Sequence, residues 1–335
     1  MSAKIVVLGA GAFGTALAKL KAEGGHQVLL WARDPEVVRA INEENRHPRR
    51  LEQVRLPSGL RATASLEEAV SEGELIVSAI PTVAVRKVWA QAKDALNPKA
   101  RILSATKGIE CDTLMLVSDI LKDVLPEKFH SHLAYLSGPS FALELARRLP
   151  TAVTIAAENP DIRQEIQRLI STDYFRAYET EDVIGVEVGG ALKNIIAIGA
   201  GAADGLGLGL NSRAALITRG LAEITRLSTI LGANPLTLAG LAGMGDLVLT
   251  CTGTLSRNRT VGFELGQGKQ LDAILEALGE VAEGVNTTMA AHALAQKHGV
   301  DMPITAAIHR VLFEGAQARE TVFELMGRAL KHELE

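Results

Sequence analysis

The sequence predicts an α/β domain at the amino-terminal end and an all-α domain at the carboxy-terminal end. Apolar runs of strand length recur as far as residue 157, and helical patterns separate the earlier ones. From about Asp182 the strand signals fade and long helical patterns replace them. We therefore expect an α/β domain over residues 1–182 and a helical domain over residues 183–335.

The first apolar run, KIVVL, leads directly into the turn GAGAFG and then into a helical pattern. Gly9 permits a tight turn, Gly11 lets a pyrophosphate approach the backbone, and Gly14 lets the helix pack closely on the strand. Ala12 and Phe13 begin the helix, whose first N–H groups face the phosphates. The motif between a strand and a helix predicts a Rossmann-like domain that binds a dinucleotide.

The end of the second strand, QVLLWARDP, bears on the choice of cofactor. An acidic residue there favours the free ribose hydroxyls of NAD, and a cation favours the 2′-phosphate of NADP. Arg33 indicates NADPH, while Asp34 beside it keeps NADH possible. An exposed arginine without a ligand is the alternative interpretation of Arg33.

Further strands are expected within residues 74–81, 100–108, 133–140 and 151–157. In parallel sheets, ligands bind beyond the carboxyl ends of the strands. We expect the residues that follow these strands to face one crevice: Pro81, Lys107, Gly108, Gly138, Ser140 and Phe141.

The helical half contains the segment GGALKNIIAIGAGAADG, in which Lys193 and Asn194 interrupt an apolar, glycine-rich helix. Burying an ammonium group is costly unless the group is paired or has a function. Two interpretations of Lys193 remain open at this point: a functional lysine, or a lysine whose stem lies along the helix while its ammonium reaches water.

Two predicted loops add polar groups. GMGDLVLT places Asp246 after a glycine turn, and CTGTLSRNRTVG presents Ser256, Arg257, Asn258 and Arg259 together. Guanidinium groups match phosphate oxygens in pairs, so the second loop is a candidate dianion cradle, with an exposed turn as the alternative.

Composition excludes several classes of protein. The net charge of −4 leaves no overall basic footprint, which disfavours nucleic acid as a partner. No run approaches the ~18 to 20 apolar residues of a membrane span, and the glycine spacing disfavours a secretory signal at the start of the chain. Cys111 and Cys251 lack metal-ligand spacing and are expected to be free thiols in a reducing cytosol. GFELGQGKQ lacks the spacing of a P-loop.

Taken together, the motifs resemble one family, the NAD(P)-dependent glycerol-3-phosphate dehydrogenases, most closely the bacterial biosynthetic type. The resemblance rests on GAGAFGTALA, SATKGI, LSGPSFA, EVGGALKNIIAIGAG, GMGDLVLTC, TLSRNR and VAEGVNT, which follow one another over nearly the whole chain.

The resemblance implies roles for particular residues. Lys193 matches the catalytic acid/base, and Lys107 matches a residue that contacts both cofactor and substrate. The other matches to the substrate site are Gly138, Ser140, Asn194, Asp246, Ser256, Arg257 and Asn258. The matches to the cofactor site outside the glycine turn are Ala142, Val281 and Glu283, with Arg257 near both ligands. Some relatives have a polar residue where this chain has Ala12, which puts a side-chain contact there in doubt.

The implied reaction is the reversible reduction of dihydroxyacetone phosphate to sn-glycerol 3-phosphate, which supplies glycerophospholipid synthesis in the cytoplasm. Lys193 would donate the proton, Lys107 and burial would lower its pKa, and Asp246 would raise that pKa and orient the lysine. The resemblance also implies a homodimer. The apolar runs, which are too short for a span, lead us to expect no integral membrane association. Two alternatives are a β-hydroxyacid dehydrogenase and a non-catalytic NADP(H)-binding protein on the same fold.

Overall fold

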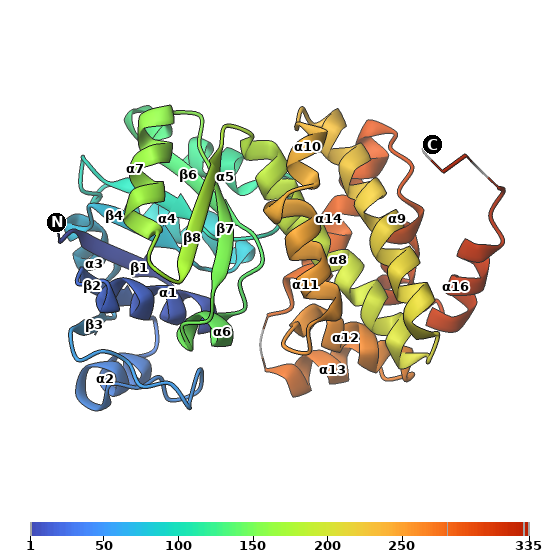
Figure 1. The fold of residues 1–335 in the computed structure, drawn as a ribbon, viewed down its shortest axis with the longest axis horizontal. Coiled ribbons are helices and arrows are strands. Elements are labelled where there is room, and N and C mark those ends of the chain that lie inside the picture. The colour runs from blue at the N-terminus through green and yellow to red at the C-terminus, as the bar shows by residue number, and fades with distance from the viewer. Residues whose placement is uncertain (1, 280, 331, 334–335) are drawn as a thin grey trace.

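The structure is a computed structural model that describes residues 2–279, 281–330 and 332–333. A sheet with its covering helices forms one half of the molecule, and a bundle of helices forms the other (Figure 1). The two described ends of the chain lie in different halves.

The first half contains one eight-stranded sheet with the order β3-β2-β1-β4-β5-β6-β7-β8. Neighbouring strands are parallel except for β6 and β7, which are antiparallel. The strands are β1 (Lys4–Leu8), β2 (Gln27–Trp31), β3 (Leu60–Thr63), β4 (Leu75–Ser78), β5 (Arg101–Ser104), β6 (Leu133–Ser137), β7 (Thr151–Ala156) and β8 (Phe175–Thr180).

This sheet confirms the predicted fold class and departs from the sequence analysis in two respects. The edge strands β3 and β8 were not predicted, because both mix polar and charged residues with apolar ones. Short or charged strands are typical of sheet edges, where one side is unpaired. The antiparallel pairing of β6 with β7 was also not predicted from the alternating pattern.

Helices cover both faces of the sheet because successive residues of each strand point to opposite faces. Ile5 and Val7 pack on one core with residues of α1, and Val6 and Leu8 pack on a second core with residues of α4 and α5. The helices of this half are α1 (Ala12–Glu23), α2 (Pro35–Glu44), α3 (Leu66–Glu72), α4 (Thr82–Ala92), α5 (Val117–Val124), the 3₁₀ helix η1 (Glu127–His132), α6 (Ala142–Ala146) and α7 (Pro160–Ile170).

The second half is helical, as predicted, and has a third core of its own. Its helices are α8 (Val183–Gly205), α9 (Gly209–Ile230), α10 (Pro235–Leu238), the π-helical turn η2 (Leu241–Gly245), α11 (Asp246–Thr252), α12 (Arg257–Gly266), α13 (Leu271–Leu278), α14 (Glu283–His298), α15 (Pro303–Phe313) and α16 (Ala318–Met326).

Helix α8 lies at the centre of the helical half and contacts α9, α11, α12 and α14 as well as β6 (Figure 1). Its glycines permit unusually close packing against α12. A Cβ atom on Gly201 would lie 2.0 Å from the carbonyl oxygen of Arg259, and one on Gly262 would lie 1.8 Å from that of Ile198. The glycine-rich sequence of α8 thus lets two helix backbones touch.

Two helical segments, α8 and residues 235–252, are long and apolar enough to cross a membrane by length and composition alone. This differs from the expectation that no run approaches such a span. Of the apolar windows of these segments, 89% in α8 and 39% in the other are buried inside the protein. A core helix of a globular domain passes the same test.

Candidate active site

Lys193 lies in the middle of α8 with its side chain buried, so its ammonium does not reach bulk water. Its Nζ donates to Oδ1 of Asp246 at 2.5 Å and to Oγ1 of Thr250 at 2.9 Å. Both partners belong to α11. The geometry rules out the interpretation of Lys193 as a lysine that extends along the helix to water.

Asp246 joins the two halves of the molecule through its second carboxylate oxygen. Lys107, which follows β5, donates from Nζ to Oδ2 of Asp246 at 2.6 Å and to the carbonyl oxygen of Gly138 at 3.3 Å. The backbone N–H of Gly138 also donates to Oδ2, at 3.4 Å. One carboxylate therefore holds two lysines that come from different domains.

The close approach of α8 to the end of β6 depends on Gly190. A Cβ atom at this position would lie 2.5 Å from Oγ of Ser137 and 3.5 Å from Cγ of Lys107. A larger residue at this position would displace the side chain of Ser137, so glycine favours the close contact of α8 with the strand ends. This contact brings Lys193 to the edge of the sheet at which ligands of such folds bind.

The local electrostatics follow from the burial of Lys193 and Asp246 beside the partly buried Lys107. The pKa of Lys193 is lowered to about 8, chiefly by burial and also by the charge of Lys107, while Asp246 opposes the shift. Burial alone would raise the pKa of Asp246, but Lys107 and Lys193 hold it below its ordinary value. At neutral pH the cluster therefore contains a carboxylate and an ammonium that gives up its proton more readily than an exposed lysine.

The glycine turn has the geometry that dinucleotide binding requires. Gly9 has φ +107°, and a Cβ atom there would lie 2.7 Å from the carbonyl oxygen of Ala79. A Cβ atom on Gly14 would lie 2.0 Å from the carbonyl oxygen of Gly9, so helix and strand pack closely. A Cβ atom on Gly11, the residue that precedes α1, would have no other atom within 4 Å. The first turn of α1, with Ala12 and Phe13, therefore offers open N–H groups to a phosphate.

Arg33 is exposed after β2, whereas Asp34 is engaged within the protein. Asp34 accepts from the N–H of Glu36 at 2.9 Å, which caps α2, and it forms an ion pair with Arg49. The hydrogen bond from Arg49 lowers the pKa of Asp34. The arginine is thus available to an anionic ligand, and the aspartate is already occupied.

Residues 256–259 form the cap and first turn of α12, not a loop, which corrects the prediction. Oγ of Ser256 accepts from the N–H of Arg259 at 3.2 Å, as a helix cap does. Arg257 is the first residue of the helix and is exposed. The local sequence resembles a turn because cap residues and turn residues are of the same types.

Asn258 links three helices, a function that the sequence did not reveal. Its Nδ2 donates to Oδ1 of Asn194 on α8 at 2.9 Å, and its Oδ1 accepts from the N–H of Gly284 on α14 at 3.0 Å. The amide nitrogen carries a second hydrogen, which it could offer to a substrate.

Glu283 reaches across to the sheet domain from the start of α14. Its Oε1 accepts from the N–H of Thr82 at 3.2 Å, at the start of α4. Burial raises the pKa of Glu283, and hydrogen bonds from Thr82 and the charge of Arg257 oppose that shift. A Cβ atom on Gly108 would lie 3.2 Å from Oε2 of Glu283. The predicted cofactor residue Glu283 thus lies beside the residues that follow β4 and β5.

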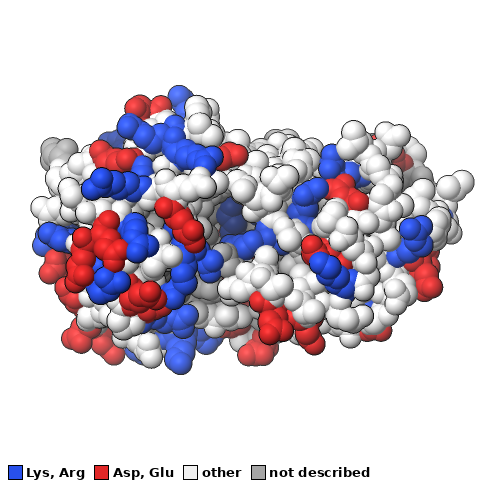
Figure 2. All heavy atoms as spheres, turned by 90° about the horizontal axis from the view of Figure 1, so that it is seen from below, with Lys and Arg blue, Asp and Glu red and all other residues white. Residues whose placement is uncertain are grey.

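The other predicted site residues lie near this junction. Oγ of Ser140 donates to the carbonyl oxygen of Gly138 at 2.9 Å, and Ala142 begins α6. Val281 is exposed and lines a cavity of about 370 Å³ with Leu275 and other residues that precede or begin α14. Viewed from below, lysine and arginine atoms gather in the hollow between the two halves (Figure 2).

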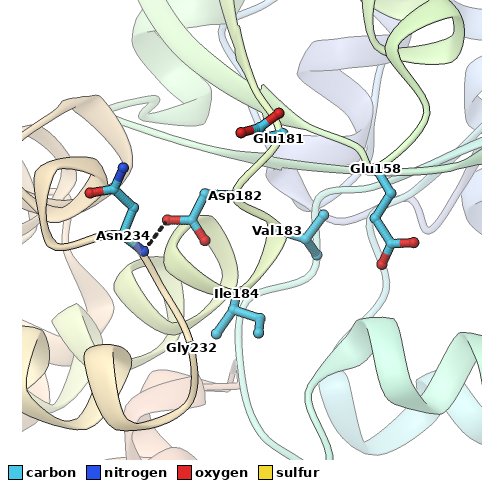
Figure 3. A pocket seen from close by; sticks show the side chains of 7 residues that line it. All are labelled: Glu158, Glu181, Asp182, Val183, Ile184, Gly232 and Asn234. Carbon is cyan, nitrogen blue, oxygen red and sulfur yellow. Dashed lines mark hydrogen bonds between the residues drawn. The ribbon is translucent and has the colours of Figure 1, made fainter.

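A second cavity, of about 310 Å³, lies where the chain enters α8 (Figure 3). Glu158, Glu181 and Asp182 line it, and Asp182 accepts from the backbone N–H groups of Gly185 and Asn234. Lys193, Lys107 and Asp246 do not line this cavity. It marks the connection between the two halves and is separate from the lysine–aspartate cluster.

Sequence reasoning missed Thr250 and Ser137. Thr250 accepts from Lys193, and its hydroxyl donates to the carbonyl oxygen of Asp246 at 2.6 Å. Oγ of Ser137 lies 3.5 Å from Oδ2 of Asp246. The position of Thr250 four residues after Asp246 is a signal that could have indicated it, since such residues share one face of a helix.

The two cysteines are free thiols, as predicted. Cys251 is buried near Lys193, and burial raises the pKa of its thiol to about 12, so it is unreactive as a nucleophile at neutral pH. No group of three or more potential metal ligands occurs among residues 2–279, 281–330 and 332–333.

A dinucleotide-type glycine turn, parallel strand ends and a buried lysine–aspartate pair define an NAD(P)-dependent dehydrogenase with a helical second domain. The family model described as NAD-dependent glycerol-3-phosphate dehydrogenase N-terminus matches residues 4–163, and the corresponding C-terminus model matches residues 182–323. The chain belongs to the NAD-dependent glycerol-3-phosphate dehydrogenase family and is an NAD(P)-dependent oxidoreductase.

Individual relatives agree with this assignment over their full length. The chain is 52% identical to a glycerol-3-phosphate dehydrogenase [NAD(P)+] of Leptospira biflexa over 98% of this chain and 99% of that protein. It is 53% identical to one of Myxococcus xanthus, over 98% of each. The crystal structure of glycerol-3-phosphate dehydrogenase from Coxiella burnetii is 40% identical, with a TM-score of 0.93 over 98% of this chain and 99% of that one.

Proposed function

We propose that this protein catalyses the reversible NAD(P)H-dependent reduction of dihydroxyacetone phosphate to sn-glycerol 3-phosphate. The observation that carries the proposal is the buried Lys193, held by Asp246 beside Lys107 where the helical domain meets the strand ends. The relatives named as glycerol-3-phosphate dehydrogenases support the choice of substrate. The product serves glycerophospholipid synthesis.

In the proposed mechanism Lys193 is the general acid. When bound, a reduced nicotinamide cofactor would supply the hydride for the carbonyl carbon. As the C=O bond becomes a C–O single bond, Nζ of Lys193 transfers a proton to the oxygen, and the neutral amine remains. Lys107 stabilises the negative charge that develops on that oxygen. In the reverse direction the neutral amine of Lys193 takes the hydroxyl proton.

Asp246 and Thr250 keep Lys193 oriented during this transfer. Asp246 accepts from Lys193 at 2.5 Å, and Thr250 accepts from it at 2.9 Å, so two of the three N–H bonds are fixed. The third hydrogen remains for the substrate oxygen. The charge of Asp246 keeps the pKa of Lys193 from falling below a useful value.

The first turn of α12 is the proposed phosphate site. The guanidinium of Arg257 and the free N–H of the Asn258 amide, with the positive end of the helix, would bind the phosphate dianion. Ser256 contributes as the cap of this helix. Gly138 and Ser140, which the resemblance assigns to the substrate site, are joined by a hydrogen bond. Binding energy at the phosphate would fix the carbonyl against Lys193.

The proposed cofactor site combines Gly9, Gly11, Ala12, Phe13 and Gly14 for the pyrophosphate with Ala142, Val281 and Glu283 near the nicotinamide side. We propose that NADPH is preferred over NADH. Arg33 is exposed for the 2′-phosphate, and Asp34 already accepts from Glu36 and Arg49.

We further propose a cofactor domain over residues 1–182 and a substrate and catalytic domain over residues 183–335, in a cytoplasmic homodimer. The homodimer and the cytoplasmic location rest on the resemblance to the glycerol-3-phosphate dehydrogenases. Light scattering after gel filtration would measure the mass of the assembly.

The test is the oxidation of NADPH, and separately of NADH, by the purified protein with dihydroxyacetone phosphate. Turnover with dihydroxyacetone phosphate, faster with NADPH, is the expected outcome. Turnover only with β-keto or β-hydroxy acids would replace the proposal by a β-hydroxyacid dehydrogenase. Absence of turnover with every candidate ketone, with retained NADPH binding, would indicate a non-catalytic NADP(H)-binding protein.

A further inference from the structure

Glu187 is a buried carboxylic acid on α8 that the proposed mechanism does not use. It lies six residues before Lys193, about 9 Å along the helix axis. Its Oε1 accepts from the backbone N–H of Ser118 at 3.0 Å. Ser118 lies in the first turn of α5, which belongs to the sheet domain. The hydrogen bond from Ser118 to Glu187 therefore connects α8, the helix of Lys193, to the domain that we propose holds the cofactor.

The surroundings of Glu187 leave little freedom for this bond. Val188 and Val186, its neighbours in sequence, are buried, and a Cβ atom on Gly189 would lie 2.8 Å from the carbonyl oxygen of Ala242. The N-terminal half of α8 is thus packed directly against other backbone. A shift of α8 relative to α5 would have to break the Glu187–Ser118 bond or displace η2.

Two buried polar atoms in this region make no direct hydrogen bond among the described residues: Oε2 of Glu187 and the hydroxyl of Tyr135. Tyr135 lies on β6, two residues before Ser137 and three before Gly138, both of which contact Asp246. The charge of Glu187 contributes to raising the pKa of Tyr135. Glu187 thus adjoins the same strand that meets the catalytic cluster.

Burial raises the pKa of Glu187 to about 8, and hydrogen bonds from Ser118 oppose this shift. The side chain is therefore largely a neutral acid at neutral pH. A glutamine has the same length and one acceptor oxygen, so it can replace the neutral acid at the N–H of Ser118. An aspartate keeps the carboxyl group but is one methylene shorter.

We propose that Glu187 is a positioning residue for this reaction, which fastens α8 to the first turn of α5 and thereby sets the distance between Lys193 and the cofactor. The inference rests on the proposed function. A displacement of about 1 Å in a reacting group can reduce the rate by about 10²-fold, so a loosened α8 lowers kcat without removing any group that touches substrate.

The test compares two variants of Glu187, one that keeps the length of the side chain and one that keeps its carboxyl group. Glu187→Gln keeps the reach and is expected to retain kcat within about threefold, whereas Glu187→Asp loses the reach and is expected to lower kcat by about 10- to 100-fold. The KM for dihydroxyacetone phosphate should change little, because the phosphate site on α12 is untouched. A larger primary isotope effect with deuterated cofactor is expected for Glu187→Asp, since hydride transfer becomes slower.

Glu223 provides the matched control. It is buried too, and it accepts from the N–H groups of Ile304 and Thr305 at the start of α15, within the helical domain alone. Glu223→Asp is expected to lower the melting temperature as Glu187→Asp does, but to leave kcat and the isotope effect unchanged. The comparison of Glu187→Asp with Glu223→Asp thus separates positioning from stability.

Two results would overturn the inference. One is full kcat in folded Glu187→Asp. The other is a loss of kcat in Glu187→Gln as large as that in Glu187→Asp. Such a loss would mean that the charge or the proton of the carboxyl group matters, and not the length of the side chain. Wild-type turnover is measured in the same assay, so failure of the proposed function appears there, independently of the variants.

Discussion

Lys21 and Lys193, one buried lysine from each domain, share a lowered pKa but differ in the partners of their ammonium groups. Lys21 in α1 and Lys193 in α8 are both buried, and burial lowers the pKa of each to about 8. Nζ of Lys21 donates to the carbonyl oxygens of Leu169 and Ile170 at 2.7 and 3.0 Å, where α7 ends. It therefore satisfies the last carbonyls of a helix.

Lys193 instead contacts a carboxylate and a hydroxyl, with a second lysine on the same carboxylate. These groups adjust its pKa in opposite directions and lie at the strand ends, where ligands of such folds bind. Burial and a lowered pKa therefore do not identify a catalytic lysine. A catalytic lysine is identified by the partners of its ammonium group and by the access of that group to the ligand site.

The largest expected effect comes from replacing each lysine by methionine, which keeps most of the length and removes the charge. Lys193→Met should lower kcat by about 10²- to 10⁴-fold, because the proton donor is lost. Lys21→Met should keep kcat within a small factor. NADPH consumption with dihydroxyacetone phosphate measures both. Comparable losses in two folded variants would show that the distinction drawn between the lysines is wrong.

Asp246→Asn tests whether the carboxylate is what makes Lys193 different. We expect kcat to fall by about 10²-fold, because Lys193 and Lys107 lose the group that orients them. The pKa of Lys193 should also fall, since the amide no longer favours the charged form. The measurement is the pH dependence of kcat/KM, which should move to lower pH. An unchanged profile would contradict the role given to Asp246.

The pH dependence of kcat/KM in the wild-type protein tests whether the proton on Lys193, and not the one on Lys21, takes part in the reaction. Reduction requires protonated Lys193, so kcat/KM for dihydroxyacetone phosphate should fall tenfold per pH unit above a pKa of about 8. Oxidation of glycerol 3-phosphate requires the neutral amine and should rise up to that pH. Because Lys21 titrates in the same range, Lys21→Met is the necessary control, and its profile should match the wild type.

The smallest effect is on stability. The pKa of Lys21 is about 8 in the folded protein against an ordinary value of 10.5, so the unfolded state binds more protons between these values. The free energy of unfolding that Lys21 contributes therefore rises with pH in this window. Relative to Lys21→Met, the wild type should gain about 2 to 3 kcal/mol between about pH 7.5 and about pH 10.

Urea unfolding of both proteins at the two pH values measures this difference. Lys193→Met cannot replace Lys21→Met in the experiment, because it also leaves Asp246 with one partner fewer. A difference between wild type and Lys21→Met that does not change with pH would mean that Lys21 is not held in the environment described above.

The sequence by itself determined the features whose signals are local. The glycine turn after β1, the internal strands, the change of class near Asp182 and the unusual lysine in α8 were all predicted, because strand periodicity, turn residues and helical periodicity act over a few residues. The family resemblance was also present in the sequence, since it rests on ordered short motifs.

Only the tertiary structure decided which groups meet. Lys107 and Lys193 precede Asp246 by 139 and 53 residues along the chain, yet both donate to its carboxylate. Periodicity fixes the face of a helix but not the neighbour that covers it. For that reason the sequence could not show that Lys21 caps a distant helix or that Glu187 joins two domains. It also could not show the edge strands β3 and β8, whose pairing is set by the sheet and not by their own residues.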